Sequence, residues 1–169
     1  MKIDYKASDG ILISGEYNNR QFEILFSDIE PYWPYATEDD FESGKAKIFE
    51  NLLIANIITS AGQGGLIIVW DLDTNLLLKH FESPYCVDFT FHNSTIYALN
   101  YVSYWGRPAC FQLNTISIIT NEISATAPLP SLDPSAYNGD INSISIAFDN
   151  TQSLYALIGE KQYYINPRN

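Results

Sequence analysis

Two histidines, His80 and His92, are the side chains best suited to move protons near neutral pH. Asp88 lies four residues before His92, so a Ser-His-Asp arrangement that activates a serine hydroxyl could be assembled from this region. The chain contains no Gly-x-Ser-x-Gly sequence, which is the turn that presents such a serine in many hydrolases. We therefore interpret His92 as a turn residue and expect a protein that is not an enzyme, with no catalytic residue.

Asp71, Asp73 and Asn75 have the spacing with which an EF-hand calcium loop begins. The glycine that such a loop needs next is missing, and Glu82, at the twelfth position, falls in an expected strand. The same three residues are typical of a hairpin turn, which is the interpretation we favour. Cys86 and Cys110 are too few for a zinc site or a disulfide framework. We expect no cofactor and no metal, and two cysteines that are not bonded to each other.

Residues 28–42 combine negative charge with aromatic rings and contain no base. They include the acids Asp28, Glu30, Glu38, Asp39, Asp40 and Glu42 and the aromatics Tyr32, Trp33, Tyr35 and Phe41. Pro31 and Pro34 stiffen the segment, so it resembles a preorganised protein interface with aromatic anchors. Tyr101, Tyr104 and Trp105 form a second aromatic loop and are the next candidates. The alternative is a solvated acidic loop whose Trp33 packs on its own core.

The elements that must carry these residues read as short strands. Alternation of apolar and polar residues in 87–92 and 144–149 is typical of half-buried antiparallel strands. Further strands are expected at 11–16, 21–26, 65–72, 76–81, 95–102, 109–113, 116–120, 154–158 and 162–165. Turns are expected at 18–19, 73–75, 92–94, 114–115 and 149–150, where Asn and Asp recur. The chain therefore reads as a single all-β domain over residues 1–169.

Two segments depart from this pattern. Residues 38–49 place Phe41, Ile48 and Phe49 at helical spacing behind a plausible cap at Thr37, so one short helix is predicted there, followed by a strand. Residues 124–140 carry three prolines without periodicity and are predicted to be a surface loop.

Residues 64–78, which contain the pair Trp70-Asp71, resemble a WD repeat, the blade unit of β-propellers. In that family the Trp-Asp pair ends the third strand of a blade, a turn leads to the fourth strand, and the next strand opens another blade. A weaker internal repeat relates residues 87–99 to residues 144–157. At ~42 residues per blade, the length allows about four blades. The resemblance implies a degenerate β-propeller of about four short antiparallel sheets that serves as a binding scaffold; the alternative is a β-sandwich.

Composition narrows the function further. The chain has 169 residues, of which 46% are hydrophobic and 17% charged, which excludes disordered and coiled-coil classes. Its net charge of −11 opposes binding to nucleic acid and favours a basic protein partner. No apolar run is long enough to span a membrane, and a cytoplasmic location is expected. We expect an immunity protein that neutralises a basic, nuclease-type toxin. The alternatives are a propeller-like adaptor in a larger assembly and a carbohydrate-active protein.

Overall fold

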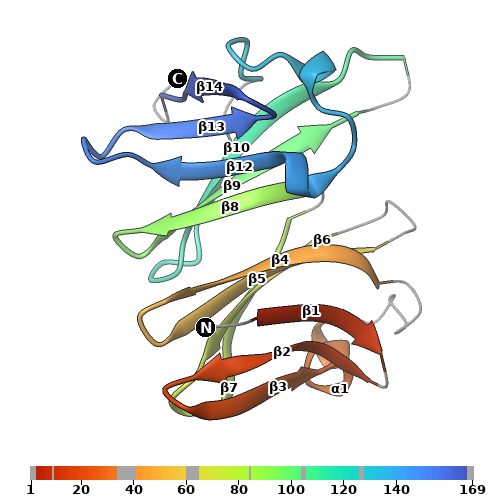
Figure 1. The fold of residues 1–169 in the computed structure, drawn as a ribbon, viewed down its shortest axis with the longest axis vertical. Helices are drawn as coiled ribbons and strands as arrows, with labels where there is room; N and C mark the ends of the chain where they lie inside the picture. Colours follow the sequence, from red (N-terminus) through yellow and green to blue (C-terminus); the bar gives the residue numbers. More distant parts are fainter. Residues whose placement is uncertain are drawn as a thin grey trace. The chain divides into compact units, whose positions relative to one another are not determined.

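The computed structural model describes residues 3–8, 10–33, 41–59, 65–83, 85–103, 106–125 and 128–166. In these ranges the structure is mostly β, with four small antiparallel sheets and one short α-helix, as Figure 1 shows. The chain divides into two compact units, Met1–Pro84 (unit 1) and Tyr85–Asn169 (unit 2). A single domain over residues 1–169 stays a prediction. No described helix is long and apolar enough to cross a membrane.

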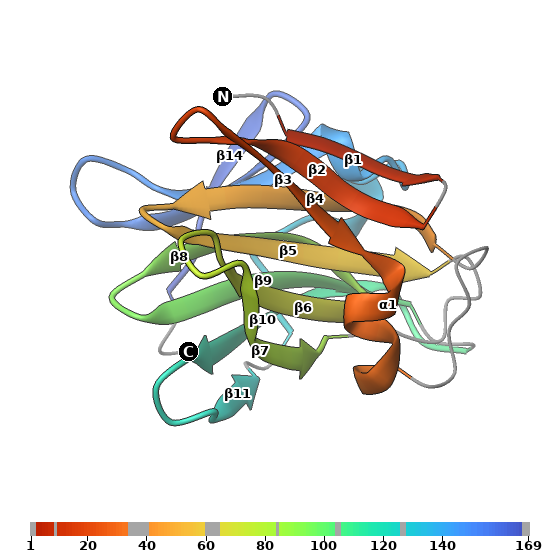
Figure 2. The ribbon, with the colours of Figure 1, turned by 90° about the horizontal axis from the view of Figure 1, so that it is seen from below.

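Unit 1 contains sheets A and B, and each is built from strands that follow one another along the chain. Sheet A has the order β1-β2-β3 and sheet B the order β4-β5-β6-β7. Their elements are β1 (Ile3–Ser8), β2 (Ile11–Tyr17), β3 (Arg20–Leu25), α1 (Phe26–Ile29), the 3-10 turn η1 (Glu30–Tyr32), β4 (Phe41–Phe49), β5 (Leu52–Thr59), β6 (Gly65–Asp71) and β7 (Leu76–Glu82). Figure 2 shows β3 leading directly into α1.

Unit 2 repeats this plan with sheets C and D. Sheet C has the order β11-β10-β9-β8 and sheet D the order β12-β13-β14. Their elements are β8 (Cys86–His92), β9 (Thr95–Val102), β10 (Cys110–Ser117), β11 (Ile123–Ala125), the 3-10 turns η3 (Pro134–Ala136) and η4 (Ile141–Ser143), β12 (Ile144–Phe148), β13 (Leu154–Ile158) and β14 (Lys161–Tyr164). The predicted loop at 124–140 contains the end of β11 and the 3-10 turn η3.

Most of the predicted turns are confirmed. Asn18 and Asn19 both have positive φ, 50° and 61°, in the two-residue turn between β2 and β3. This is the combination that a type I′ hairpin turn requires, and Asn tolerates it well. Asn75 and Asn93 also have positive φ at hairpin turns. The predicted turn at residues 114–115 is wrong, because these residues lie inside β10 and pair with both β9 and β11.

The predicted helix at residues 38–49 is also wrong. Residues 34–40 lie outside the described ranges, and 41–49 form strand β4, which pairs with β5 from Phe41 with Thr59 to Phe49 with Leu52. Glu50 takes a positive φ of 57° in the turn between the two strands. Pairing with the apolar strand β5 satisfies the backbone groups on one side of β4, the edge strand of sheet B, and this tertiary gain outweighs a helical spacing that Gly44 already weakens.

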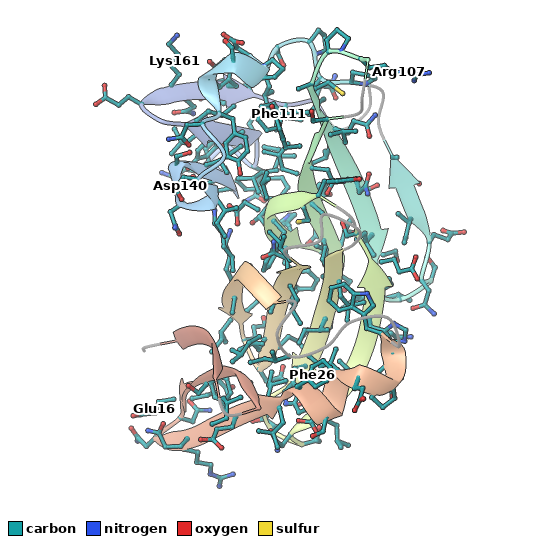
Figure 3. The ribbon with its side chains drawn as sticks, turned by 90° about the vertical axis from the view of Figure 1, so that its right-hand side faces the viewer. Glu16, Phe26, Arg107, Phe111, Asp140 and Lys161 are labelled. Atoms are coloured by element: carbon teal, nitrogen blue, oxygen red, sulfur yellow. The ribbon has the colours of Figure 1, made fainter. Side chains whose placement is uncertain are left out.

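Each unit has its own hydrophobic core. The core of unit 1 includes Ile13, Ile24, Leu53, Ile68 and Trp70. The core of unit 2 includes Phe111, Leu113, Ile144, Ile146 and Leu154, and Figure 3 shows Phe111 among the side chains inside unit 2. These buried alternate positions explain why the apolar residues of the strands recur with a period of two.

The expected burial of two alternating strands is confirmed only in part. Phe89 and Ile146 are fully buried, whereas Phe91 and Phe148 are half-buried. The alternation also predicted a solvent-facing Asp88, and this is wrong, because its side chain is completely buried. An irregularity in the register between Cys86 and Asp88 accompanies the departure. Strand β8 is therefore covered on both faces, which the simple alternation of its sequence does not indicate.

Candidate functional site

The first part of the acidic, aromatic segment lies directly after β3. Asp28 sits in α1, where its carboxylate Oδ2 accepts a hydrogen bond from the Leu25 N–H at 2.9 Å. Glu30 is exposed, and Tyr32 is 47% exposed. Trp33 is half-buried and packs against the core of unit 1. The structure thus presents Glu30 and Tyr32 to solvent and gives Asp28 and Trp33 local structural contacts.

The remaining predicted partner-binding residues divide into two groups. Tyr35, Glu38, Asp39, Asp40, Tyr104 and Trp105 lie outside the described residues, and Glu42 is placed only by its backbone, on β4. Tyr101 is half-buried in unit 2, with its ring 5.3 Å from that of Phe111 and 4.9 Å from that of Tyr137. Tyr101 therefore has packing partners of its own within unit 2.

The two histidines make contacts with aromatic rings. The Tyr32 ring lies 4.6 Å from that of His80 on β7, and the planes are inclined by 36°. His92 lies 4.9 Å from Phe148 in unit 2. Stacked positions of this kind fix the imidazole rings by packing.

The edge strand β7 carries two exposed leucines. Leu76 is 61% and Leu78 47% exposed, and exposed His80 on the same strand contacts the Tyr32 ring. The register of β7 shifts where the strand passes Val69 and Trp70 of β6, so Leu76 and His80 lie on opposite faces of sheet B. We call the exposed side chains of this edge strand and its aromatic neighbour, Leu76, Leu78, His80 and Tyr32, the β7 face. Large apolar side chains gathered on one strand are uncommon on surfaces that remain in water, and such patches are typical of binding sites.

A groove of about 730 Å³ runs along β3 in the same unit. It is lined by Tyr17, Arg20, Gln21, Phe22, Glu23, Leu25, Asp28, Leu72, Asp73 and Asn75. One wall is β3 with the start of α1, and the other is the turn between β6 and β7. The groove carries three acids and one base, together with apolar groups from both walls, so it combines negative charge with apolar contact surface.

The turn that forms the second wall is held by side-chain hydrogen bonds. Trp70 Nε1 donates to Asn75 Oδ1 at 3.1 Å. The Asp71 carboxylate accepts from the backbone N–H groups of Asp73 and Thr74, at 2.8 and 3.2 Å. The hydrogen bonds from Thr74 and then Asp73 hold the pKa of Asp71 below its usual value, because they favour the charged carboxylate. These bonds account for Asp71, Asp73 and Asn75 as turn residues.

Unit 1 carries most of the negative charge of the chain. Fourteen of the twenty acids and six of the nine bases lie in residues 1–84, which gives this unit −8 of the total −11. Figure 3 shows Glu16 of β2 among polar side chains that point away from the ribbon. A field of this sign attracts cationic partners and speeds their association.

Sequence reasoning missed the groove and the β7 face. Two signals pointed to them. Leu25 is apolar at a position where β3 alternates toward solvent, and it is 38% exposed. The run Leu76-Leu77-Leu78 has to place leucines on both sides of a strand, so at least one must face outward. Neither signal shows that β3 and the turn between β6 and β7, which are far apart in the sequence, form the two walls of one groove.

Within the described ranges, no group of three or more His, Cys, Asp or Glu side chains is arranged to hold a metal ion. A second hollow of about 510 Å³ lies in unit 2 beside Phe148, Leu154 and Tyr164. It is lined by Phe148, Gln152, Ser153, Leu154, Tyr164, Ile165 and Asn166, a set without a charged side chain. Compared with protein-family models and with curated proteins, the chain matches none of them.

Proposed function

We propose that this chain is a non-enzymatic protein-binding domain that binds a basic protein through unit 1. The observation that carries the proposal is the β7 face. Its exposed Leu76, Leu78 and Tyr32 lie in the unit that holds −8 of the charge. Apolar anchors supply affinity in protein interfaces, whereas surrounding charges set the association rate and the choice of partner.

Among basic partners we favour a nuclease-type toxin, which makes the chain an immunity protein. Such an inhibitor has to offer negative charge and flat apolar groups to a surface that otherwise binds phosphates and bases. Glu30 beside Tyr32 and the ring pair of Tyr32 and His80 fit this requirement. Tyr35, Glu38, Asp39, Asp40 and Glu42 remain proposed contact residues, and Tyr101, Tyr104 and Trp105 remain a proposed secondary site.

The test is binding to any basic, nuclease-type protein found encoded beside the gene of this chain, measured at low and at physiological salt. Leu78→Ala and Tyr32→Ala should raise the dissociation rate, and Glu30→Lys should slow association more at low salt. Ile119→Ala is the matched control, since Ile119 is 74% exposed but belongs to unit 2. Equal binding by all four variants, or no complex with such a protein, would overturn the proposal.

A propeller-like scaffold is the second candidate, and the strand order favours it. Each of the four sheets is a meander of consecutive strands, as the blades of a propeller are. Trp70 and Asp71 end the third strand of sheet B, and the turn after them leads to the fourth. We propose four degenerate blades around a common axis. An experimental structure with the sheets stacked face to face in pairs, as in a sandwich, would contradict this.

A further inference from the structure

The outer edge of β3 is open. Sheet A has three strands and ends at β3, whereas sheet B of the same unit has four. No described strand pairs with the outer side of β3, and the groove of about 730 Å³ runs along this side. An open strand edge offers backbone N–H and C=O groups to any extended chain that lies beside it.

The hairpin geometry identifies which backbone groups are open. The two-residue type I′ turn at Asn18 and Asn19 is closed by Tyr17 and Arg20, which form a hydrogen-bonded pair. Bonded and non-bonded pairs alternate along an antiparallel ladder, so Phe22 is bonded to Gly15 of β2. Gln21 and Glu23 therefore direct their N–H and C=O groups away from β2, into the open edge.

Asp28 determines where this edge ends. By the same alternation the Leu25 N–H also points outward, and it is the group that donates to Asp28 Oδ2 at 2.9 Å. The observed bond supports the assignment of the alternating directions. It also limits the open stretch to the residues before Leu25, which leaves room for a partner strand of about five residues at ~3.4 Å per residue.

The side chains along the edge indicate the chemistry of the partner strand. Phe22 and Leu72 present apolar surface within the groove, and Glu23 and Asp73 present carboxylates. A strand beside β3 would place alternate side chains on the two faces of sheet A. Apolar residues would then lie with Phe22, and basic residues would lie with Glu23.

From these observations we propose that β3 accepts an extended basic segment, with alternating apolar and Lys or Arg residues, as the fourth strand of sheet A. The occupant is a segment of the basic protein partner, so the inference rests on the proposed function and specifies its contact. Strand addition of this kind derives affinity from main-chain hydrogen bonds and specificity from alternate side chains.

The probe is a seven-residue peptide of alternating lysine and valine, titrated into the full chain while amide hydrogen exchange is followed by NMR. Free protein should exchange the Gln21 and Glu23 amides faster than those of Phe22 and Ile24. Bound peptide should slow exchange at Gln21 and Glu23. A peptide with methylated backbone nitrogens at alternate residues, and one with glutamate in place of lysine, should each bind at least about tenfold more weakly.

The matched variants are Glu23→Lys and Glu50→Lys, which change the net charge equally. Glu50 lies in the β4–β5 turn and does not line the groove. Glu23→Lys should weaken peptide binding at least about tenfold, and Glu50→Lys should leave it nearly unchanged. Equal loss in both variants, or unchanged exchange at Gln21 and Glu23, would overturn the proposal.

A basic protein that still binds the Glu23→Lys variant fully would refute the β3 contact and leave the proposed function standing. Peptide binding at β3 in a chain that forms no complex with a basic protein would support the β3 contact and overturn the proposed function.

Discussion

The carboxylate of Asp88 on β8 accepts a hydrogen bond from the backbone N–H of Ile146 on β12, with 2.8 Å between Oδ2 and the nitrogen. Asp88 is fully buried, and the two strands belong to different sheets of unit 2. The bond connects sheets C and D through a side chain, and it satisfies a buried N–H group of the first strand of sheet D. Asp88 is therefore a structural residue of unit 2.

Asp88→Ala should destabilise the protein. The substitution removes the acceptor of a buried N–H group, and a buried donor left unsatisfied costs about 1–3 kcal/mol. Asp88→Asn keeps an acceptor oxygen and should cost less. Urea unfolding measures both, with Glu160→Ala at an exposed turn as the control, expected within about 0.5 kcal/mol of the parent. If Asp88→Ala matches that control, the bond to Ile146 contributes nothing to stability.

Phe89→Ala should lower the free energy of unfolding by ~3–5 kcal/mol, because a fully buried ring is replaced by a cavity. Phe91 is only half-buried, so Phe91→Ala should cost less. Chemical denaturation of the two variants shows directly which substitution lowers the free energy of unfolding more. The reverse order would contradict the deeper burial of Phe89.

Stability should fall at acid pH through turn carboxylates. A hydrogen bond from the Thr151 hydroxyl and then one from the Ser153 N–H lower the pKa of Asp149. The pKa of Asp133 is lowered in the same way by the Ser135 side chain and N–H. The folded state thus takes up these protons at lower pH than the unfolded chain, so the stabilisation is present above the usual pKa of 3.8 and is lost as the pH falls through the lowered pKa values.

Thr151→Val tests this assignment, because it removes the hydroxyl donor and leaves the Asp149 carboxylate in place. Unfolding free energies measured from neutral pH to pH ~3 should decline less steeply for the variant than for the parent. A parallel decline would show that the Thr151 hydroxyl bond to Asp149 does not contribute to acid sensitivity.

Tyr137 should contribute to alkaline sensitivity. Its burial, followed by the negative charge of Asp140 and the neighbouring Tyr101, raises its pKa to about 12. The unfolded chain ionises this phenol near the usual tyrosine pKa of 10.0, so the stabilisation is complete below that pH and is lost as the pH rises toward 12. Phenolate absorbance should show a late-ionising tyrosine that is absent in Tyr137→Phe. Asp140→Asn should shift that ionisation to lower pH.

Cys86 and Cys110 should remain reduced thiols. They lie on β8 and β10, which flank β9. Two strand spacings separate them by at least about 9–10 Å, beyond the Cα separation of ~7 Å that a disulfide allows. The thermal midpoint should not depend on reductant. Iodoacetamide should modify half-buried Cys110 faster than buried Cys86, and equal rates would contradict the burial of Cys86.

Local patterning was sufficient to predict most strands, because alternation and Asn-rich turns act over a few residues. It was insufficient where pairing partners are distant. Strand β4 has helical spacing, and only its pairing with β5 makes it extended. Asn114 is of a residue type that is typical of turns, but it lies in the middle of β10 and pairs with both β9 and β11. The burial of Asp88 depends on the Ile146 N–H, which is 58 residues away.

The candidate site was predictable only in its charge. The sequence places six acids and four aromatics in residues 28–42, and Glu30 and Tyr32 are exposed as a binding surface requires. The β7 face and the groove depend on which strands end their sheets. That information lies in the pairing of whole strands and not in any single segment.

The order of strands within the sheets has a consequence for how the chain folds. Every sheet pairs neighbours in sequence, and several hairpins close through turns of only two residues, as at Asn18–Asn19 and Asn93–Ser94. Each pairing therefore closes a short loop, and the mean sequence separation of contacts is small for an all-β protein. Since folding rates rise as this separation falls, the protein should refold fast for an all-β protein. During synthesis, sheet A can pair while sheet D has not yet left the ribosome.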